Sequence, residues 1–265
     1  MKKTSLLKIF CSVLSVVLLM SSCLGDGDSS FTIEKDFAYI VENNYGQRYA
    51  ITSNGYIMHE NITKLTAGNC YFIAYKIISG SADGYYNAEY VNVLNDGKAI
   101  TKGLFQKPAE NLETISPSSL SIQAWSWNNA IGDNWLIGYN LAKKERDEVK
   151  VFFYYDPDNQ KYTDGTTVVE IDPVKDNKII IDIRFVITDA VGGESVNESS
   201  YAVGNLSSLR AGIAEFRPNF SGVSTDYVNV PVKFRYQKKD VTEPQYIGNW
   251  QWDGSNAYYI QFTKN

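Results

Sequence analysis

Apolar and polar residues alternate along several segments of the chain, most regularly over 149–155, 181–187 and 228–236. Successive side chains of a β-strand point to opposite faces, so a period of two predicts antiparallel strands with one buried and one polar face. The polar positions opposite the apolar stripes include Asp182, Arg184, Asn229, Lys233 and Arg235. Pro231 also lies on the polar side of its segment, which predicts an edge strand there.

Turn signals separate these segments. Asn54-Gly55 lies between two short apolar runs, and this dipeptide accepts the positive φ of a tight hairpin turn. Helical periodicity is thin: 205–216 allows either one helix, capped by Ser207 or Ser208, or a crossover loop. Further turn signals are Asp83-Gly84, Asp96-Gly97, Asp164-Gly165, Gly192-Gly193 and Asp253-Gly254. We therefore expect an all-β fold.

The strand pattern is interrupted over 107–119, where prolines and polar residues gather. About five strands precede this break in 31–106, a size typical of a small five-stranded barrel such as the OB-fold. Roughly seven or more strands follow it in 120–265, enough for a larger antiparallel β-sandwich. The expected organisation is an OB-like barrel, a linker at 107–119 and a β-sandwich.

The N-terminus has the pattern of a secretory signal. Lys2 and Lys3 precede an apolar stretch, 9–20, that is shorter than the roughly 20 residues a membrane-spanning helix needs. Two serines and Cys23 follow, and this exit resembles the lipobox of bacterial lipoproteins, in which the cysteine carries acyl groups. We expect 1–22 to be a signal peptide and Cys23 to be lipidated. The alternatives are an ordinary signal peptide with an incidental cysteine and an uncleaved anchor helix.

A flexible acidic tether follows at 23–30. Its acidic residues resemble the surface-export signal of lipoproteins in the Bacteroidetes, although a solvated linker has the same composition. We expect an outer-membrane lipoprotein of the cell envelope, exposed at the surface and held in the membrane by its N-terminal lipid. Loss of 1–22 removes three of the 25 basic residues and none of the 30 acidic ones, so the net charge changes from −5 to −8. This acidity argues against nucleic acid as a partner, because phosphates need a basic face.

The layout as a whole resembles the NigD-like lipoproteins of Bacteroidetes. The features that carry the resemblance are the lipobox, the acidic tether, a small barrel before a larger sandwich, and the late strand 230–236. The chain departs from that pattern in its tail, which adds 248–252 and an aromatic strand at 258–260. The resemblance implies an envelope lipoprotein with an OB-like N-terminal domain, a C-terminal sandwich and no known enzymatic activity.

Candidate catalytic chemistry is sparse. His59 is the one histidine, which excludes most histidine-based catalysis and sites with several histidine ligands, and a solvated strand end is its simplest interpretation. No glycine-rich phosphate or dinucleotide motif and no nucleophile elbow is present in the sequence. Cys70 begins an apolar run and is expected to be a core residue. The protein is predicted not to be an enzyme and to hold no cofactor or metal.

Two alternatives stay open. Carboxylates are plentiful, so the inventory of residues leaves open a glycosidase that uses a pair of them. The oxygen-rich segment 156–159, with Asp164 nearby, leaves open a calcium site, although Asp and Asn also favour turns.

The five tryptophans include two closely spaced pairs: Trp125 with Trp127, near Trp135, and Trp250 with Trp252. Residues two apart on a strand point the same way, so each pair forms a two-ring surface. An exposed surface of this kind suits stacking against sugar rings, whereas a buried one is core, the default for so large a side chain. We expect a non-catalytic protein that binds a glycan or a partner protein through the two pairs or through loops of the barrel. The alternative is a structural component of an envelope complex that pairs through sheet edges.

Overall fold

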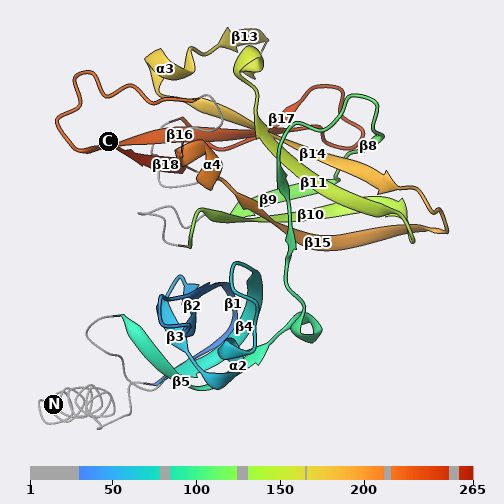
Figure 1. The fold of residues 1–265 in the computed structure, drawn as a ribbon. Helices are drawn as coiled ribbons and strands as arrows, with labels where there is room; N and C mark the ends of the chain where they lie inside the picture. Colours follow the sequence, from blue (N-terminus) through green and yellow to red (C-terminus); the bar gives the residue numbers. More distant parts are fainter. Residues whose placement is uncertain are drawn as a thin grey trace, which may run out of the picture.

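The computed structural model describes residues 30–77, 84–123, 131–164, 166–211, 216–250 and 257–264. Over these residues the protein is mostly β: a closed five-stranded barrel near the N-terminus is followed by further sheets, and the helices are short. Figure 1 shows the barrel on one side of the later sheets and the hairpin of β12 (Lys161–Asp164) and β13 (Thr167–Glu170) on the other. In the part of the chain that the structure describes, no helix has the length and apolarity needed to cross a membrane.

The barrel closes on itself through five strands. Its order is β1-β2-β3-β5-β4, and β4 pairs with β1 to complete the circle. The pair β3–β5 is parallel and the other pairs are antiparallel. Its elements are β1 (Phe31–Glu42), β2 (Arg48–Thr52), β3 (Gly55–Met58), α2 (Glu60–Thr63), β4 (Cys70–Ile77) and β5 (Tyr85–Val93). Alternate residues of these strands fill the interior, among them Ile40, Ile57, Ile73, Tyr75 and Val91.

The predicted Asn54-Gly55 hairpin is confirmed, because Thr52 at the end of β2 pairs with Gly55 at the start of β3. Gly55 has a φ of +123°, and a Cβ at this position would lie 2.7 Å from the carbonyl oxygen of Gly84. That oxygen accepts a hydrogen bond from the backbone N–H of Tyr56 at 2.9 Å. The turn therefore needs a glycine both for its dihedral angle and for the close approach of Gly84, the residue before β5.

Two larger sheets follow the barrel. The four-stranded sheet has the order β6 (Thr101–Lys102), β15 (Ser195–Asn205), β10 (Asn134–Lys144) and β9 (Ser119–Gln123). The seven-stranded sheet has the order β17 (Gln245–Ile247), β16 (Tyr227–Tyr236), β14 (Ile179–Asp189), β11 (Glu148–Tyr155) and β7 (Leu104–Phe105). In addition, β18 (Tyr258–Thr263) pairs with β16 and β8 (Thr114–Ile115) pairs with β14. The remaining helical turns are η1 (Asn95–Gly97), η2 (Pro157–Asn159), α3 (Pro173–Asp176) and α4 (Ser207–Arg210).

The two larger sheets share one hydrophobic core. Trp135 of β10 is buried in it, and its ring centroid lies 5.2 Å from that of Phe234 of β16. A second cluster of buried residues joins the barrel to the four-stranded sheet, and it comprises Phe37, Cys70, Phe72, Ile100, Ile131, Leu136 and Val203. The four-stranded sheet thus lies between the barrel and the seven-stranded sheet, and the β12–β13 hairpin lies beyond (Figure 1).

Three local predictions are wrong. The later sheets are not purely antiparallel, since β14–β16, β11–β7 and β15–β6 are parallel; alternation predicts a strand but not the direction of its neighbour. β16 is not an edge strand: Pro231 lies opposite Tyr259 of β18, and pairing with β14 begins only at Val232, so the proline takes no place in that ladder. The N-cap of α4 is Leu206, without a side-chain cap bond.

The segment after the barrel contributes short strands to both larger sheets. β6 and β7 fall within the range 31–106 that the sequence pattern assigns to the barrel, and they pair with β15 and β11. β8 falls within the range 107–119 expected to be a linker, and it pairs with β14. Backbone pairing therefore holds this segment against the sheets.

Candidate functional site

A row of polar side chains crosses the outer face of the seven-stranded sheet. Asp182 of β14 pairs with Arg235 of β16, and Arg235 pairs with Tyr246 of β17. Arg184 and Lys233 share this face, because each lies two residues along its strand. The prediction of a single buried face is wrong here: Asp182 is 1% exposed and Arg235 is 4% exposed.

The β12–β13 hairpin and the turn before it cover this face. Gln160, a buried residue, takes the place of a neighbouring strand for Ile180. Its Oε1 accepts from the Ile180 N–H at 2.7 Å, and its Nε2 donates to the Ile180 carbonyl at 3.0 Å. Nε2 also donates to the carbonyl of Asp156 at 2.8 Å. The base of the hairpin is therefore bonded to β14, which holds Tyr162 of β12 over the sheet.

Arg235 forms the second anchor of the hairpin. Its Nε and one terminal nitrogen donate to the two carboxylate oxygens of Asp182 at 2.7 and 2.6 Å. Its other donors reach Asn159 and the carbonyl of Lys161 at distances between 3.0 and 3.2 Å. Burial opposes the charged guanidinium, but the hydrogen bonds and charge of Asp182, with Tyr246, raise the pKa of Arg235 above its usual value. All five N–H donors of Arg235 are thus used within the protein.

Arg184 has the opposite character. Its guanidinium lies 3.3 Å from Asp182, and it donates weakly to the carbonyl of Ile183 at 3.5 Å. Asp182 is already bound at shorter distances by Arg235, so it compensates the charge of Arg184 only in part. The Arg184 side chain is 29% exposed. It therefore presents a cation with spare donors to the space under the hairpin.

Three aromatic rings line the same region. The ring centroids of Tyr162 and Tyr246 lie 6.3 Å apart at an angle of 76°, and those of Tyr162 and Trp250 lie 5.6 Å apart at 65°. The Lys233 ammonium lies 4.4 Å from the Tyr162 centroid and 4.9 Å from the Trp250 centroid, a cation–π arrangement. Burial is the main cause that lowers the pKa of Lys233 below its usual value.

Beside these rings lies a cavity of about 260 Å³, which we name the hairpin groove. Tyr162 and Tyr246 form part of its wall, Arg184 supplies a charge, and Val168 of β13, which is 65% exposed, adds an apolar rim. The other lining residues are Asn159, Lys161, Thr163, Arg235, Glu243 and Pro244. Aromatic walls with a few convergent polar groups are the usual composition of a small-ligand site.

Of the four tryptophans predicted to bind a ligand, only Trp250 is among the described residues. Trp250 lies beside the hairpin groove and is half-buried; its Nε1 is buried without a hydrogen-bond partner among the described residues. Because Lys233 lies against its ring, Trp250 supports Tyr162 more than it offers an open stacking surface. Four predicted residues lie outside the described residues: Trp125, Trp127, Trp252 and the lipidation site Cys23.

Tyr162 and Tyr246 were not predicted from the sequence, because they are two of 19 tyrosines and belong to no local motif. The charged residues of the site could have been found from the sequence. Asp182 and Arg184 lie two apart on one predicted strand, and Lys233 and Arg235 lie two apart on another, so each pair shares one face of its strand. The pattern gave no indication that a separate hairpin covers them, because that contact joins segments distant along the chain.

Cys70 and His59 have structural roles. Cys70 is buried, as expected of a core residue, and burial raises the pKa of its thiol to about 12, so the thiol stays protonated at neutral pH. His59 follows β3 and is the N-cap of α2, where its Nδ1 accepts from the Asn61 N–H at 3.1 Å. This capping bond gives the strand-end histidine a defined partner.

The oxygen-rich segment 156–159 forms the turn η2. The carboxylate of Asp156 accepts from the Asp158 N–H at 3.2 Å and from the Lys107 ammonium at 3.0 Å. Among the residues with described positions, no three His, Cys, Asp or Glu side chains gather in a way that could hold a metal ion. The contacts of Asp156 are those of a turn residue.

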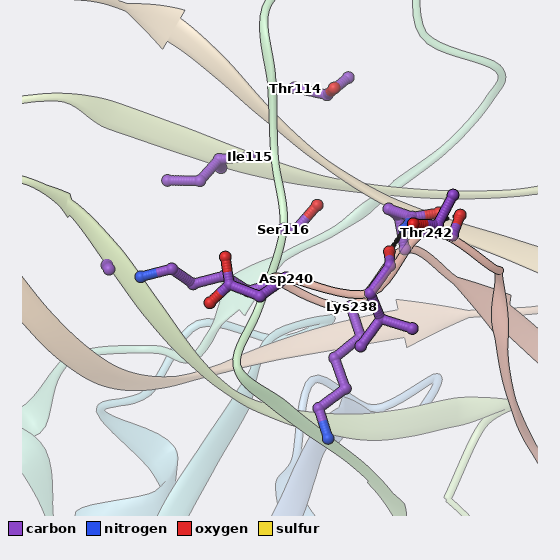
Figure 2. A pocket seen from close by; sticks show the side chains of 10 residues that line it. Thr114, Ile115, Ser116, Lys238, Asp240 and Thr242 are labelled. Carbon is purple, nitrogen blue, oxygen red and sulfur yellow. Dashed lines mark hydrogen bonds between the residues drawn. The ribbon is translucent and has the colours of Figure 1, made fainter.

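A larger cavity, of about 590 Å³, lies between 114–116 and the turn 237–242. Figure 2 shows its labelled side chains spread over the walls of the cavity instead of converging on one point. Its described lining contains no aromatic ring, and its charged residues, Lys238, Lys239 and Asp240, are of both signs. We therefore take the hairpin groove as the candidate site.

No family model matches the chain, and no curated protein and no solved structure matches it either. The geometry of the hairpin groove is therefore the basis for proposing a function.

Proposed function

We propose that the protein is a lipid-anchored, non-catalytic lipoprotein of the cell envelope that binds a glycan in the hairpin groove. The observation that carries the proposal is the meeting of two tyrosine rings and a partly exposed guanidinium around one cavity. Aromatic rings stack on the C–H faces of sugars, and polar side chains hydrogen-bond sugar hydroxyls. Tyr246 is the principal stacking ring, because Lys233 already lies over Tyr162 and Trp250.

We propose the cellular localisation and the family of the protein from its sequence. The lipobox at Cys23 and the acidic tether support an outer-membrane lipoprotein at the cell surface, and the layout of the chain supports a NigD-like lipoprotein. Protease treatment of intact cells tests the proposed surface localisation. We expect the protein to be cleaved while a lipoprotein of the inner leaflet survives; cleavage only after lysis would contradict surface exposure.

We also propose that the barrel is OB-like and that the two larger sheets form a β-sandwich. The barrel order β1-β2-β3-β5-β4, with α2 between β3 and β4, supports an OB-like barrel. The core shared by the two larger sheets supports a β-sandwich. In this arrangement the hairpin groove lies on the outer face of one sheet of the sandwich.

Binding of glycans by the purified protein tests the role of the groove. We expect a glycan panel to retain the wild-type protein, and Tyr246→Ala to weaken the affinity for the retained glycan by about tenfold or more, because a stacking surface is lost. Tyr45→Ala is the matched control, since Tyr45 is 94% exposed in the barrel. Equal affinities of the two variants, or retention by no glycan, would contradict the proposal.

A second candidate function, assembly through a sheet edge, is favoured by β9. Within the described residues, β9 has β10 on one side in the four-stranded sheet and no strand on the other. A strand at the end of a sheet can pair with a strand of another chain. An assembly component would copurify with a partner protein after mild detergent extraction and would bind no soluble glycan; a lone monomer in such extracts would argue against it.

A further inference from the structure

The charge of the hairpin groove specifies which class of glycan it takes, an inference that rests on the proposed function. Three cationic residues, Lys161, Arg184 and Arg235, line the groove, against one acidic residue, Glu243. The buried Asp182 beneath them is held by both oxygens to Arg235 and neutralises that residue. The whole chain has a net charge of −5, so the groove is a local reversal of the overall sign.

Arg184 is the cation best placed to meet a ligand. The Arg235 guanidinium has no donor left, whereas Arg184 makes one contact of 3.3 Å and one weak hydrogen bond of 3.5 Å. The Arg184 side chain is 29% exposed and lines the groove. A guanidinium presents its donors in a planar fork that fits both oxygens of a carboxylate. An anionic group in the groove would therefore bind Arg184 before it bound Arg235.

The placement of the cation and the stacking ring around one cavity suits a single sugar residue. Arg184 lies on β14 and Tyr246 on β17, with β16 between them. Tyr246 is opposite Arg235 and Arg235 is opposite Asp182, so Arg184 lies two residues further along its strand than the position in line with Tyr246. Both side chains line the hairpin groove, so a small ligand in it can contact the guanidinium and the tyrosine ring together. A pyranose ring with a carboxylate on its exocyclic carbon carries an anion for the first and a C–H face for the second.

We propose that the hairpin groove binds a uronic acid residue of an acidic glycan, with the sugar carboxylate on Arg184 and the sugar ring against Tyr246. Lys161, an exposed residue that lines the groove, adds long-range attraction for a polyanionic chain, and this attraction is screened by salt. The uronate, and not a neutral hexose, is the residue that satisfies the spare donors of Arg184.

A pair of ligands that differ only in charge tests this proposal. The probes are an oligogalacturonate and the same oligosaccharide with its carboxylates methyl-esterified, titrated into the wild-type protein, Arg184→Gln and the control Lys238→Gln. We expect the acid to bind the wild type and Lys238→Gln about ten- to a hundredfold more tightly than the ester, as loss of charge-assisted hydrogen bonds implies. Arg184→Gln is expected to lose this preference and to bind the ester as the wild type does.

The outcomes separate the inference from the proposed function. Equal binding of acid and ester by the wild type would overturn the uronate assignment and leave glycan binding in place, and so would retention of neutral glycans alone. An unchanged preference in Arg184→Gln would overturn the assignment of the carboxylate to Arg184. Failure of the wild type to bind either probe or any glycan of the panel would overturn the proposed function and the inference with it. The comparison of the two ligands on the wild type needs no variant to fold.

Discussion

Arg184 and Arg235 lie on adjacent strands and on one face of a sheet, yet they have different roles. All N–H donors of Arg235 are hydrogen-bonded inside the protein, to Asp182, Asn159 and Lys161. Arg235 therefore fixes the hairpin to the sheet. Arg184 shares the same carboxylate at a longer distance and keeps donors for a ligand. Two identical side chains thus differ in function because one is saturated by its neighbours.

This difference predicts unequal costs of truncation. Arg235→Ala leaves the charge of Asp182 buried, and the free energy of unfolding is expected to fall by about 3–5 kcal/mol. Arg184→Ala removes a partly exposed partner, and the expected fall is about 1 kcal/mol or less. Urea denaturation of both variants beside the wild type measures the two values. Equal losses would show that Arg235 is not the anchor of the hairpin.

At the scale of elements, turns and hairpins carry the information that alternation lacks. The Asn54-Gly55 signal is local, because the dihedral angles of the turn depend on its own residues, and the structure confirms it. Strand faces were predictable for the same reason: the stripe of 228–236 places Val230, Val232 and Phe234 in the core. The direction of neighbouring strands and the covering of Asp182 by the β12–β13 hairpin depend on contacts between distant segments. The position of the candidate site therefore could not be predicted from sequence patterns, although its charged residues could be recognised on the predicted strands.

A matched pair of glycines tests the account of the barrel turns. Gly55→Ala combines a φ of +123° with a contact of 2.7 Å to the Gly84 oxygen, so we expect a loss of about 2–4 kcal/mol in stability. Gly46 also has a positive φ, of +76°, but has nothing within 4 Å of a Cβ. Gly46→Ala is therefore expected to cost only about 1 kcal/mol. Thermal melting of the two variants compares them, and a cost at Gly46 as large as at Gly55 would refute the steric argument.

At the scale of the whole molecule, the order of layers relates the proposed anchor to the proposed site. The barrel packs on the four-stranded sheet through Phe72, Leu136 and Val203. The β12–β13 hairpin, which carries part of the groove wall, lies beyond the other sheet (Figure 1). A lipid at Cys23 would lead into the barrel through β1. The barrel would then lie between the lipid and the groove along the chain, because every residue that lines the groove follows the barrel.

Hydrogen exchange with and without a bound glycan tests the central claim, that the hairpin groove is the binding site, most directly. We predict that the glycan slows amide exchange in 160–164, 166–170 and 243–247, because these segments carry groove walls and become more stable when the groove is filled. The amides of the barrel, over 31–77, are predicted to exchange as in the free protein. Protection confined to the barrel or to the turn 237–242, with none in the hairpin, would contradict the claim.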